Sequence, residues 1–117
     1  MKLAEIAQRL GLRDLTPETA GAADAEVSRA YASDLLSDVL ANAPGGGLLV
    51  TVQVHMNVVA VAVHAGAAAV VFANGRVPDE AVRQKAAEEN LKLFTTRETA
   101  FDVAGRLYEL GVRGGRA

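Results

Sequence analysis

The spacing of apolar residues along the chain predicts an alternation of strands and helices. Residues 2–11 have helical spacing and end at Gly11, which favours a short amphipathic N-terminal helix. Residues 12–24 contain Pro17, Gly21 and scattered acidic residues, so we expect a loop or linker there. Strand patterns follow, weak at 26–31, clear at 48–54, and again at 67–73 and 91–95.

Helical patterns lie between and after these strands. Ser33 or Asp34 is expected to be the N-cap of a helix whose buried stripe is Leu35, Leu36, Val39 and Leu40. Pro78 fits the first turn of a later helix that ends near Asn90. Thr95 and Glu98 have capping-box spacing before a last amphipathic helix with Phe101, Ala104, Leu107 and Tyr108 on its apolar side.

The mostly apolar segment from Met56 to His64 is ambiguous between strand and helix. The apolar runs on either side look like parallel neighbours, and a parallel crossover needs about a dozen residues, so we expect a helix that ends at Gly66. This helix would be apolar nearly all round, and a small monomer has few elements to cover it. We therefore expect a homodimer through the apolar helix of residues 56–65, from Met56 to Ala65.

This order of elements predicts an α/β fold. Strands that alternate with helices form a mostly parallel sheet with helices on both faces, which is a three-layer, Rossmann-like arrangement of about four to five strands. The length of 117 residues predicts one domain, with a core over 25–111 and a flexible tail over 112–117.

Composition limits the function. Half of the residues are hydrophobic but only 4% are aromatic, so Ala, Val and Leu must build the core. The net charge of −2 is unlike that of a nucleic-acid-binding surface. The chain contains no cysteine and its first residues lack the apolar segment of a signal peptide, so we expect a cytoplasmic location and no membrane span.

No catalytic or metal-binding motif is recognisable. The triplet Gly45-Gly46-Gly47 follows a helix and precedes a strand, the reverse of a phosphate loop. His55 and His64 have no cysteine or carboxylate near them in sequence that would complete a metal site. We therefore expect no enzyme activity, no metal and no cofactor.

Polar residues do gather at the predicted strand ends. In a parallel sheet these ends share the carboxyl edge, where such folds bind ligands. Their hydroxyls, amides and guanidinium groups suit an anion such as a nucleotide or phosphate. The expected ligand-binding residues are Ser33, Asp34, Ser37, Thr51, Gln53, His55, Asn57, Asn74, Gly75, Arg76, Thr95, Thr96 and Arg97.

An alternative explains the same residues without a ligand. Turns from strand to helix need polar side chains as caps, and these residues would then only hold the turns. The domain would in that case be a pure interaction module that binds itself or a regulatory protein partner.

Several short segments in order resemble a stand-alone DRTGG domain. They are residues 33–40, residues 51–62, residues 74–80, and the ending Phe94-Thr95-Thr96 with Phe101 and residues 105–108. The resemblance covers the chain from about Glu26 to Gly111. The residues that match are Asp34, Ser37, Thr51, His55, Asn57, Gly75 and Pro78.

This resemblance implies an α/β fold similar to the N-terminal domain of HPr kinase/phosphorylase. It also implies a regulatory role without an activity of its own, since such domains accompany CBS domains and pyrophosphatases and help to form dimers. The chain departs from the motif that names the family. Ala73-Asn74-Gly75 stands where Thr-Gly-Gly is expected, and no Asp-Arg pair occurs.

Overall fold

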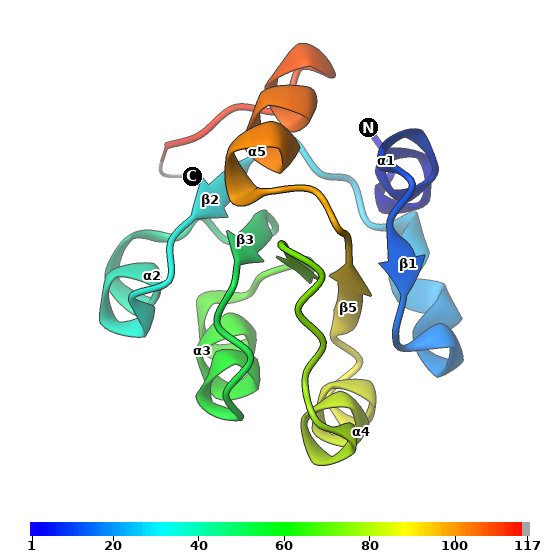
Figure 1. The fold of residues 1–117 in the computed structure, drawn as a ribbon, viewed down its shortest axis with the longest axis vertical. Helices are drawn as coiled ribbons and strands as arrows, with labels where there is room; N and C mark the ends of the chain where they lie inside the picture. The colour runs from blue at the N-terminus through cyan, green and yellow to red at the C-terminus, as the bar shows by residue number, and fades with distance from the viewer. Residues whose placement is uncertain (116–117) are drawn as a thin grey trace.

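A computed structural model describes residues 1–115 of the protein (Figure 1). The prediction of one domain over all 117 residues stays a prediction. In order, the elements are α1 (Leu3–Leu10), β1 (Arg13–Asp14), the 3-10 helix η1 (Pro17–Asp24), β2 (Ala30–Ala32), α2 (Leu36–Asn42), β3 (Leu48–Thr51), α3 (Asn57–Ala65), β4 (Ala69–Phe72), α4 (Glu80–Glu88), β5 (Lys92–Thr95) and α5 (Ala100–Glu109).

The strands form one five-stranded sheet in the order β1-β5-β4-β3-β2. Strands β2 to β5 run parallel, and β1 pairs antiparallel with β5 at one edge. The mostly parallel sheet is therefore confirmed. The parallel strands also follow one another in sequence order, so the order does not reverse between any two of them.

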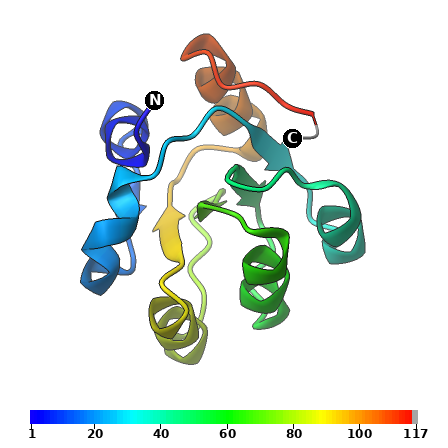
Figure 2. The same cartoon turned by 180° about the vertical axis from the view of Figure 1, so that it is seen from behind.

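Helices cover both faces of this sheet and make three layers (Figures 1 and 2). The three helices that connect the parallel strands, α2, α3 and α4, pack on one face. The first and last helices, α1 and α5, pack on the other. This arrangement confirms the three-layer, Rossmann-like fold.

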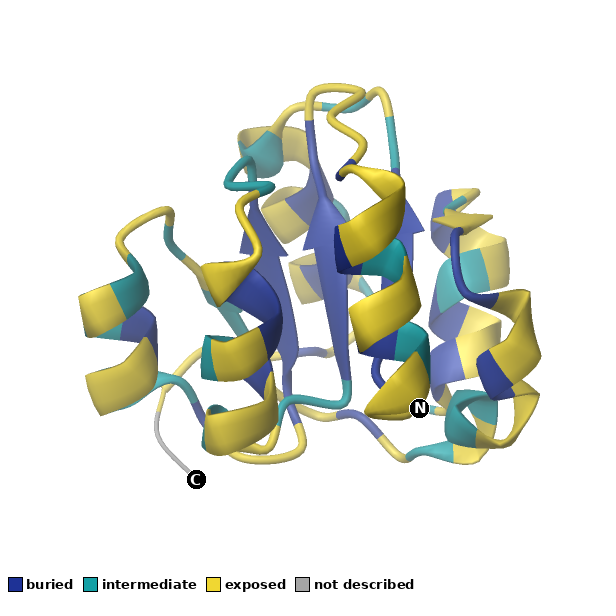
Figure 3. Ribbon diagram, turned by 90° about the horizontal axis from the view of Figure 1, so that it is seen from below, coloured by how far each residue is buried: buried dark blue, intermediate teal, exposed yellow. Residues whose placement is uncertain are grey.

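The central strands are buried on both faces. In β3, Leu48 and Val50 belong to the core on the α1 and α5 side, whereas Leu49 belongs to the core on the side of α2, α3 and α4. All residues of β3, β4 and β5 are buried, while the outer sides of the helices are exposed (Figure 3). Successive side chains of a strand point to opposite faces, so a run of apolar residues fills both layers at once.

The predicted helix stops at Gly11 and Gly66 are confirmed. Both glycines adopt left-handed backbone angles, with φ of 66° and 72°. A residue with a Cβ reaches this conformation only at a cost, which is why glycine ends both helices. No helix within residues 1–115 is long and apolar enough to span a membrane.

The predicted loop over 12–24 is wrong, because it contains β1 and η1. The missed strand has only two residues and pairs with β5 about 80 positions later, so no local pattern reveals it. A buried Lys92 holds this region, since its ammonium group bonds Asp14 at 2.5 Å and the carbonyl of Thr16 at 3.0 Å.

The limits of the core and the tail also differ from the prediction. Leu3, Ile6 and Leu10 of α1 are buried, so the core is not confined to 25–111. In the expected tail, Val112 is buried and the Arg113 carbonyl accepts from the Ala30 amide at 3.0 Å. Residues 116–117 of that tail lie outside the described residues.

Several element starts were misplaced. The first parallel strand is Ala30–Ala32 rather than 26–31. Helix α2 begins at Leu36 without a side-chain cap, so neither Ser33 nor Asp34 caps it. Pro78 precedes the N-cap of α4, which is Asp79, and therefore lies before the first turn.

The expected capping box before α5 is also wrong. The N-cap is Thr99, whose hydroxyl accepts from the Asp102 amide at 3.2 Å. Thr95 is the last residue of β5, and a bend at Arg97 and Glu98 delays the start of the helix, so the later Thr99 becomes the cap.

Two predicted apolar stripes are only partly buried. Val39 and Leu107 are buried, but Leu35, Leu40, Phe101 and Tyr108 are 48–85% exposed. Helix α2 has only seven residues and buries one of them, Val39, fully. Helix α5 faces the sheet through Val103 and Leu107, one turn apart, and its other apolar side chains face away from that contact.

Two phenylalanines test this difference. Phe72→Ala removes a fully buried ring from β4 and should lower the free energy of unfolding by about 3–5 kcal/mol. Phe101→Ala makes the same chemical change at a side chain that is 85% exposed and should change it by less than about 0.5 kcal/mol. Urea unfolding followed by circular dichroism measures both, and equal effects would contradict the placement of these rings.

Candidate functional site

The carboxyl ends of β3, β4 and β5 meet at one edge of the sheet. The register aligns Thr51, Phe72 and Thr95 across these three strands. Strand spacing places Thr51 about 10 Å from Thr95. Both threonines are buried and both hydroxyls are used, since Thr51 donates to Asp34 at 2.8 Å and Thr95 to the carbonyl of Arg76 at 2.7 Å.

Asp34 joins the end of β2 to the end of β3. Its Oδ1 atom accepts from the Thr51 hydroxyl and from the Val52 amide, both at 2.8 Å. Ser33 is used nearby, because its hydroxyl accepts from the Leu35 amide at 3.2 Å. Ser37 lies exposed in the first turn of α2. These contacts tie two turns together.

The polar residues after β3 hold their own loop. The Gln53 amide donates to the Thr51 hydroxyl at 3.1 Å, and the His55 amide donates to the Gln53 side chain at 3.4 Å. The Asn57 amide then donates to Nδ1 of His55 at 3.1 Å. A polar side chain that accepts from the amide two residues later is typical of turns. The polar side chains at every second position of this segment therefore serve as hydrogen-bond acceptors for the backbone amides of the loop.

The loops after β4 and β5 are bonded to each other. Asn74 and Gly75 both have left-handed backbone angles, with φ of 60° and 69°. The Asn74 amide donates to the Glu98 carbonyl at 2.9 Å, and the Gly75 amide donates to the Thr96 carbonyl at 2.7 Å. These two hydrogen bonds join the loop after β4 to the loop after β5 and form a wall at the carboxyl end of the sheet.

A cavity of about 590 Å³ opens beside this wall, next to the end of α1. Its lining includes four of the predicted residues, namely Gly75, Thr95, Thr96 and Arg97. It also includes residues that sequence reasoning missed, namely Leu10, Gly11, Arg13, Val77 and Glu98. Arg13 lies on β1, whose pairing with β5 gave no local signal in the sequence.

The predicted ligand-binding residues therefore do not all lie around one cavity. The cavity lining includes residues from the ends of β4 and β5 but none of Ser33, Asp34, Ser37, Thr51, Gln53, His55 and Asn57. Asn74 and Arg76 flank the lining residue Gly75 without lining the cavity themselves. The sequential strand order explains this result, since ligand crevices of open sheets form where the strand order reverses.

The cavity has an excess of positive charge. Its one carboxylate, Glu98, is paired with Arg106 at 2.7 Å. Within residues 1–115, the guanidinium groups of Arg13 and Arg97 have neither a hydrogen bond nor an ion pair, and both residues are exposed. Two free guanidinium groups on one cavity favour an anion.

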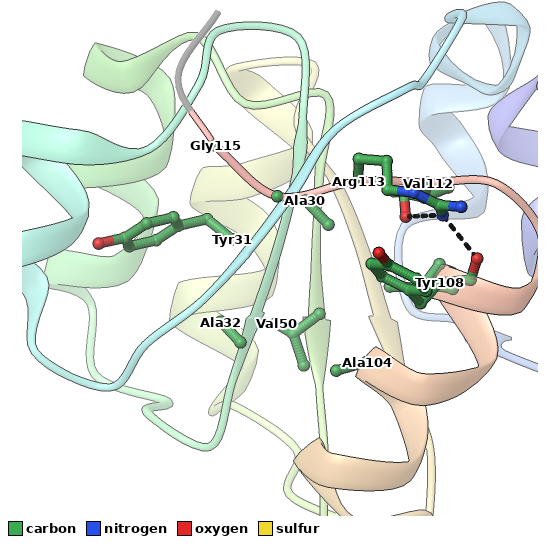
Figure 4. Close-up of a pocket in the computed structure, with 11 residues that line it drawn as sticks. Ala30, Tyr31, Ala32, Val50, Ala104, Tyr108, Val112, Arg113 and Gly115 are labelled. Carbon is green, nitrogen blue, oxygen red and sulfur yellow. Dashed lines mark hydrogen bonds between the residues drawn. The ribbon is translucent and has the colours of Figure 1, made fainter.

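A second cavity, of about 300 Å³, lies between β2 and α5 (Figure 4). It is hollow because Ala30, Ala32 and Ala104 have small side chains, and Tyr31 points away from it. Its one charged residue, Arg113, is held over the Tyr108 ring at 3.8 Å and donates to the Tyr108 carbonyl at 2.7 Å. This cavity is apolar and does not suit an anion.

Residues 1–115 hold no group of three or more histidine or acidic side chains that could bind a metal ion. His55 is exposed and its Nδ1 atom is used by the Asn57 amide. Asp38, the carboxylate of α2, accepts from Tyr31 and Asn42.

Comparison with known proteins supports the fold. No protein-family model matches the chain, and no curated protein matches its sequence. A solved structure that is similar is the crystal structure of the CBS and DRTGG domains of the regulatory region of Clostridium perfringens pyrophosphatase, complexed with its activator diadenosine tetraphosphate. The TM-score is 0.73 at 11% identity, over 89% of this chain.

This chain spans 44% of the length of that pyrophosphatase chain. At such low identity the likeness shows the fold alone. It agrees with the DRTGG-like α/β fold that the sequence resemblance implies.

The pKa of Asp38, in the first turn of α2, tests the hydrogen bond between α2 and β2. The Tyr31 hydroxyl lies 2.8 Å from both oxygens of Asp38 and lowers the pKa of that carboxyl below its usual value, with smaller contributions from Asn42 and Ser33. Charged Asp38 therefore stabilises the fold above its unfolded pKa, and this contribution is lost as the pH falls through the lower, folded pKa.

Tyr31→Phe removes the main donor and should raise the pKa of Asp38 toward its usual value. Titration of the side-chain carboxyl signals by NMR measures this shift. Tyr108→Phe is the matched control, because Tyr108 lies on α5 and should leave the pKa of Asp38 unchanged. An unaltered Asp38 pKa in Tyr31→Phe would show that this hydrogen bond does not form in solution.

Proposed function

We propose that this domain is a non-catalytic regulatory module that senses a nucleotide or other anion at the carboxyl edge of its sheet. The observation that carries the proposal is the cavity of about 590 Å³ next to the end of β5, lined by Thr96, Arg97 and the backbone of Gly75. Its size falls in the usual range for small-molecule sites. The regulatory setting of the similar pyrophosphatase domains, a structure complexed with a nucleotide activator, supports this role.

The cytoplasmic location inferred from the cysteine-free sequence stays a prediction, and it suits a sensor of small phosphorylated molecules.

Isothermal titration with AMP, ADP, ATP and inorganic phosphate tests the proposal. At least one of them should give a binding heat. The affinity should fall about tenfold between roughly 0.05 and 0.5 M salt, because exposed guanidinium groups are screened by ions. Absence of heat with all four ligands would contradict the proposal and favour a domain that only binds protein.

A second candidate function is self-association through α3. The inner side of this helix, with Val58, Val59 and Ala62, is buried in the core. Its outer side exposes Met56, Ala60 and Val63, at positions i, i+4 and i+7. These side chains line an apolar groove of about 300 Å³ between α3 and α4, bordered by Lys85 and Glu89. We propose that a second copy covers this groove with its own α3.

Light scattering tests the dimer. The monomer mass is 12.2 kDa, so the dimer should have twice that mass, 24.4 kDa, at micromolar concentration. Ala60→Glu places a charge at the centre of the groove and should shift the mass to that of a monomer. Ala41→Glu, at an exposed position of α2, is the matched control and should remain dimeric. A monomeric native protein would refute this association.

A further inference from the structure

We propose that the ligand of the β5 cavity is a phosphate monoester of mononucleotide size, held between the guanidinium groups of Arg13 and Arg97. This inference rests on the proposed function and names both the chemical class of the ligand and an arginine from outside the parallel sheet. Three observations support it: β1 places Arg13 beside β5, the guanidinium groups of Arg13 and Arg97 are unpaired within residues 1–115, and apolar side chains also line the cavity.

The antiparallel pairing of β1 brings Arg13 to the site. Arg13 lies directly opposite Thr95, and opposite residues of paired strands project on the same face of the sheet. Arg97 follows two residues after Thr95, and both arginines line the same cavity. One cation therefore comes from the edge strand and the other from the loop between β5 and α5.

The negative charge at this cavity is already neutralised by the protein. Arg106 donates to Oε2 of Glu98 at 2.7 Å and also to the carbonyls of Arg9 at 2.7 Å and Leu10 at 3.3 Å. This network fixes the carboxylate and joins α5 to the end of α1. Arg13 and Arg97 have no such partner within residues 1–115, so the cavity keeps two uncompensated positive charges.

Two guanidinium groups match a phosphate monoester better than a carboxylate. The phosphate carries close to two negative charges at neutral pH and three terminal oxygens, and each guanidinium can donate two hydrogen bonds in a fork. The Thr96 hydroxyl accepts from the Glu98 amide at 3.3 Å, which leaves its proton to donate to a further phosphate oxygen.

The rest of the lining suits the organic part of such a ligand. Leu10 and Val77 contribute apolar surface to the cavity, and Val77 is 51% exposed. A volume of about 590 Å³ is far larger than a phosphate ion requires and fits a mononucleotide. A base or ring placed on these side chains would be removed from water and would add to the affinity.

A ligand held in this way would act on the shortest strand of the sheet. Strand β1 has only two residues, and the Leu15 amide that follows it donates to the Leu93 carbonyl at 2.9 Å. A phosphate bound by both arginines would add a link between β1 and the loop after β5. Binding would therefore restrain the α1–β1 segment relative to the sheet, which is a structural change that a partner protein can sense.

Isothermal titration with AMP, inorganic phosphate and adenosine tests the ligand class and the site together. AMP should bind more tightly than phosphate, and adenosine should give no heat. Arg13→Gln and Arg97→Gln should each weaken AMP binding at least tenfold. Arg29→Gln is the matched control, because it removes the same charge at an exposed residue beside β2, at the opposite edge of the sheet, and should bind AMP like the native protein.

Hydrogen exchange gives a second measurement. AMP should slow exchange of the Arg13 and Leu15 amides in the native protein and not in Arg97→Gln, whose folding is checked by circular dichroism. If AMP binds but Arg13→Gln and Arg97→Gln keep native affinity while Arg76→Ala or Asn57→Ala loses it, the two-arginine site is wrong and the proposed anion-sensing function stands. If neither AMP nor phosphate binds the native protein, both proposals fail.

Discussion

The central sheet holds together only if helices cover both of its faces, and the rest of the structure follows from that constraint. Parallel strands made of valine, leucine and alanine expose apolar side chains on two sides, and water must be excluded from each. The three connecting helices cover one face, and α1 and α5, the helices at either end of the described chain, cover the other. With few aromatic residues, close packing of many small side chains fills these two layers.

The sequential strand order decides where a cavity forms at the carboxyl edge of the sheet. A sheet whose parallel strands add in one direction has no reversal between them, so it lacks the central crevice of a doubly wound fold. The carboxyl edge is still the polar edge, but the cavity lies at its end, where the antiparallel β1 and the end of α1 close against β5. The N-terminal segment thus contributes both to the core and to the lining of the cavity.

Most polar residues at the strand ends serve the backbone. Asp34, Thr51 and Thr95 are used in contacts between neighbouring turns, and Gln53 and His55 hold successive amides of the loop after β3. A buried or turn-forming backbone group needs a partner, and these side chains supply it. Arg13 and Arg97 differ, because no side-chain contact within residues 1–115 occupies their guanidinium groups, which line the cavity instead of holding a turn.

The sequence by itself determined the α/β class, the strands β3, β4 and β5 and the glycine stops, because local periodicity and backbone preference specify them. The length that a parallel crossover requires then placed α3. It also grouped Gly75, Thr96 and Arg97, which line one cavity beside the end of β5. Only the tertiary structure decided that Arg13 joins them, that Thr99 rather than Thr95 caps α5, and that Phe101 stays exposed. Those outcomes depend on pairings between distant segments and on which helix face meets the sheet, and neither is encoded in neighbouring residues.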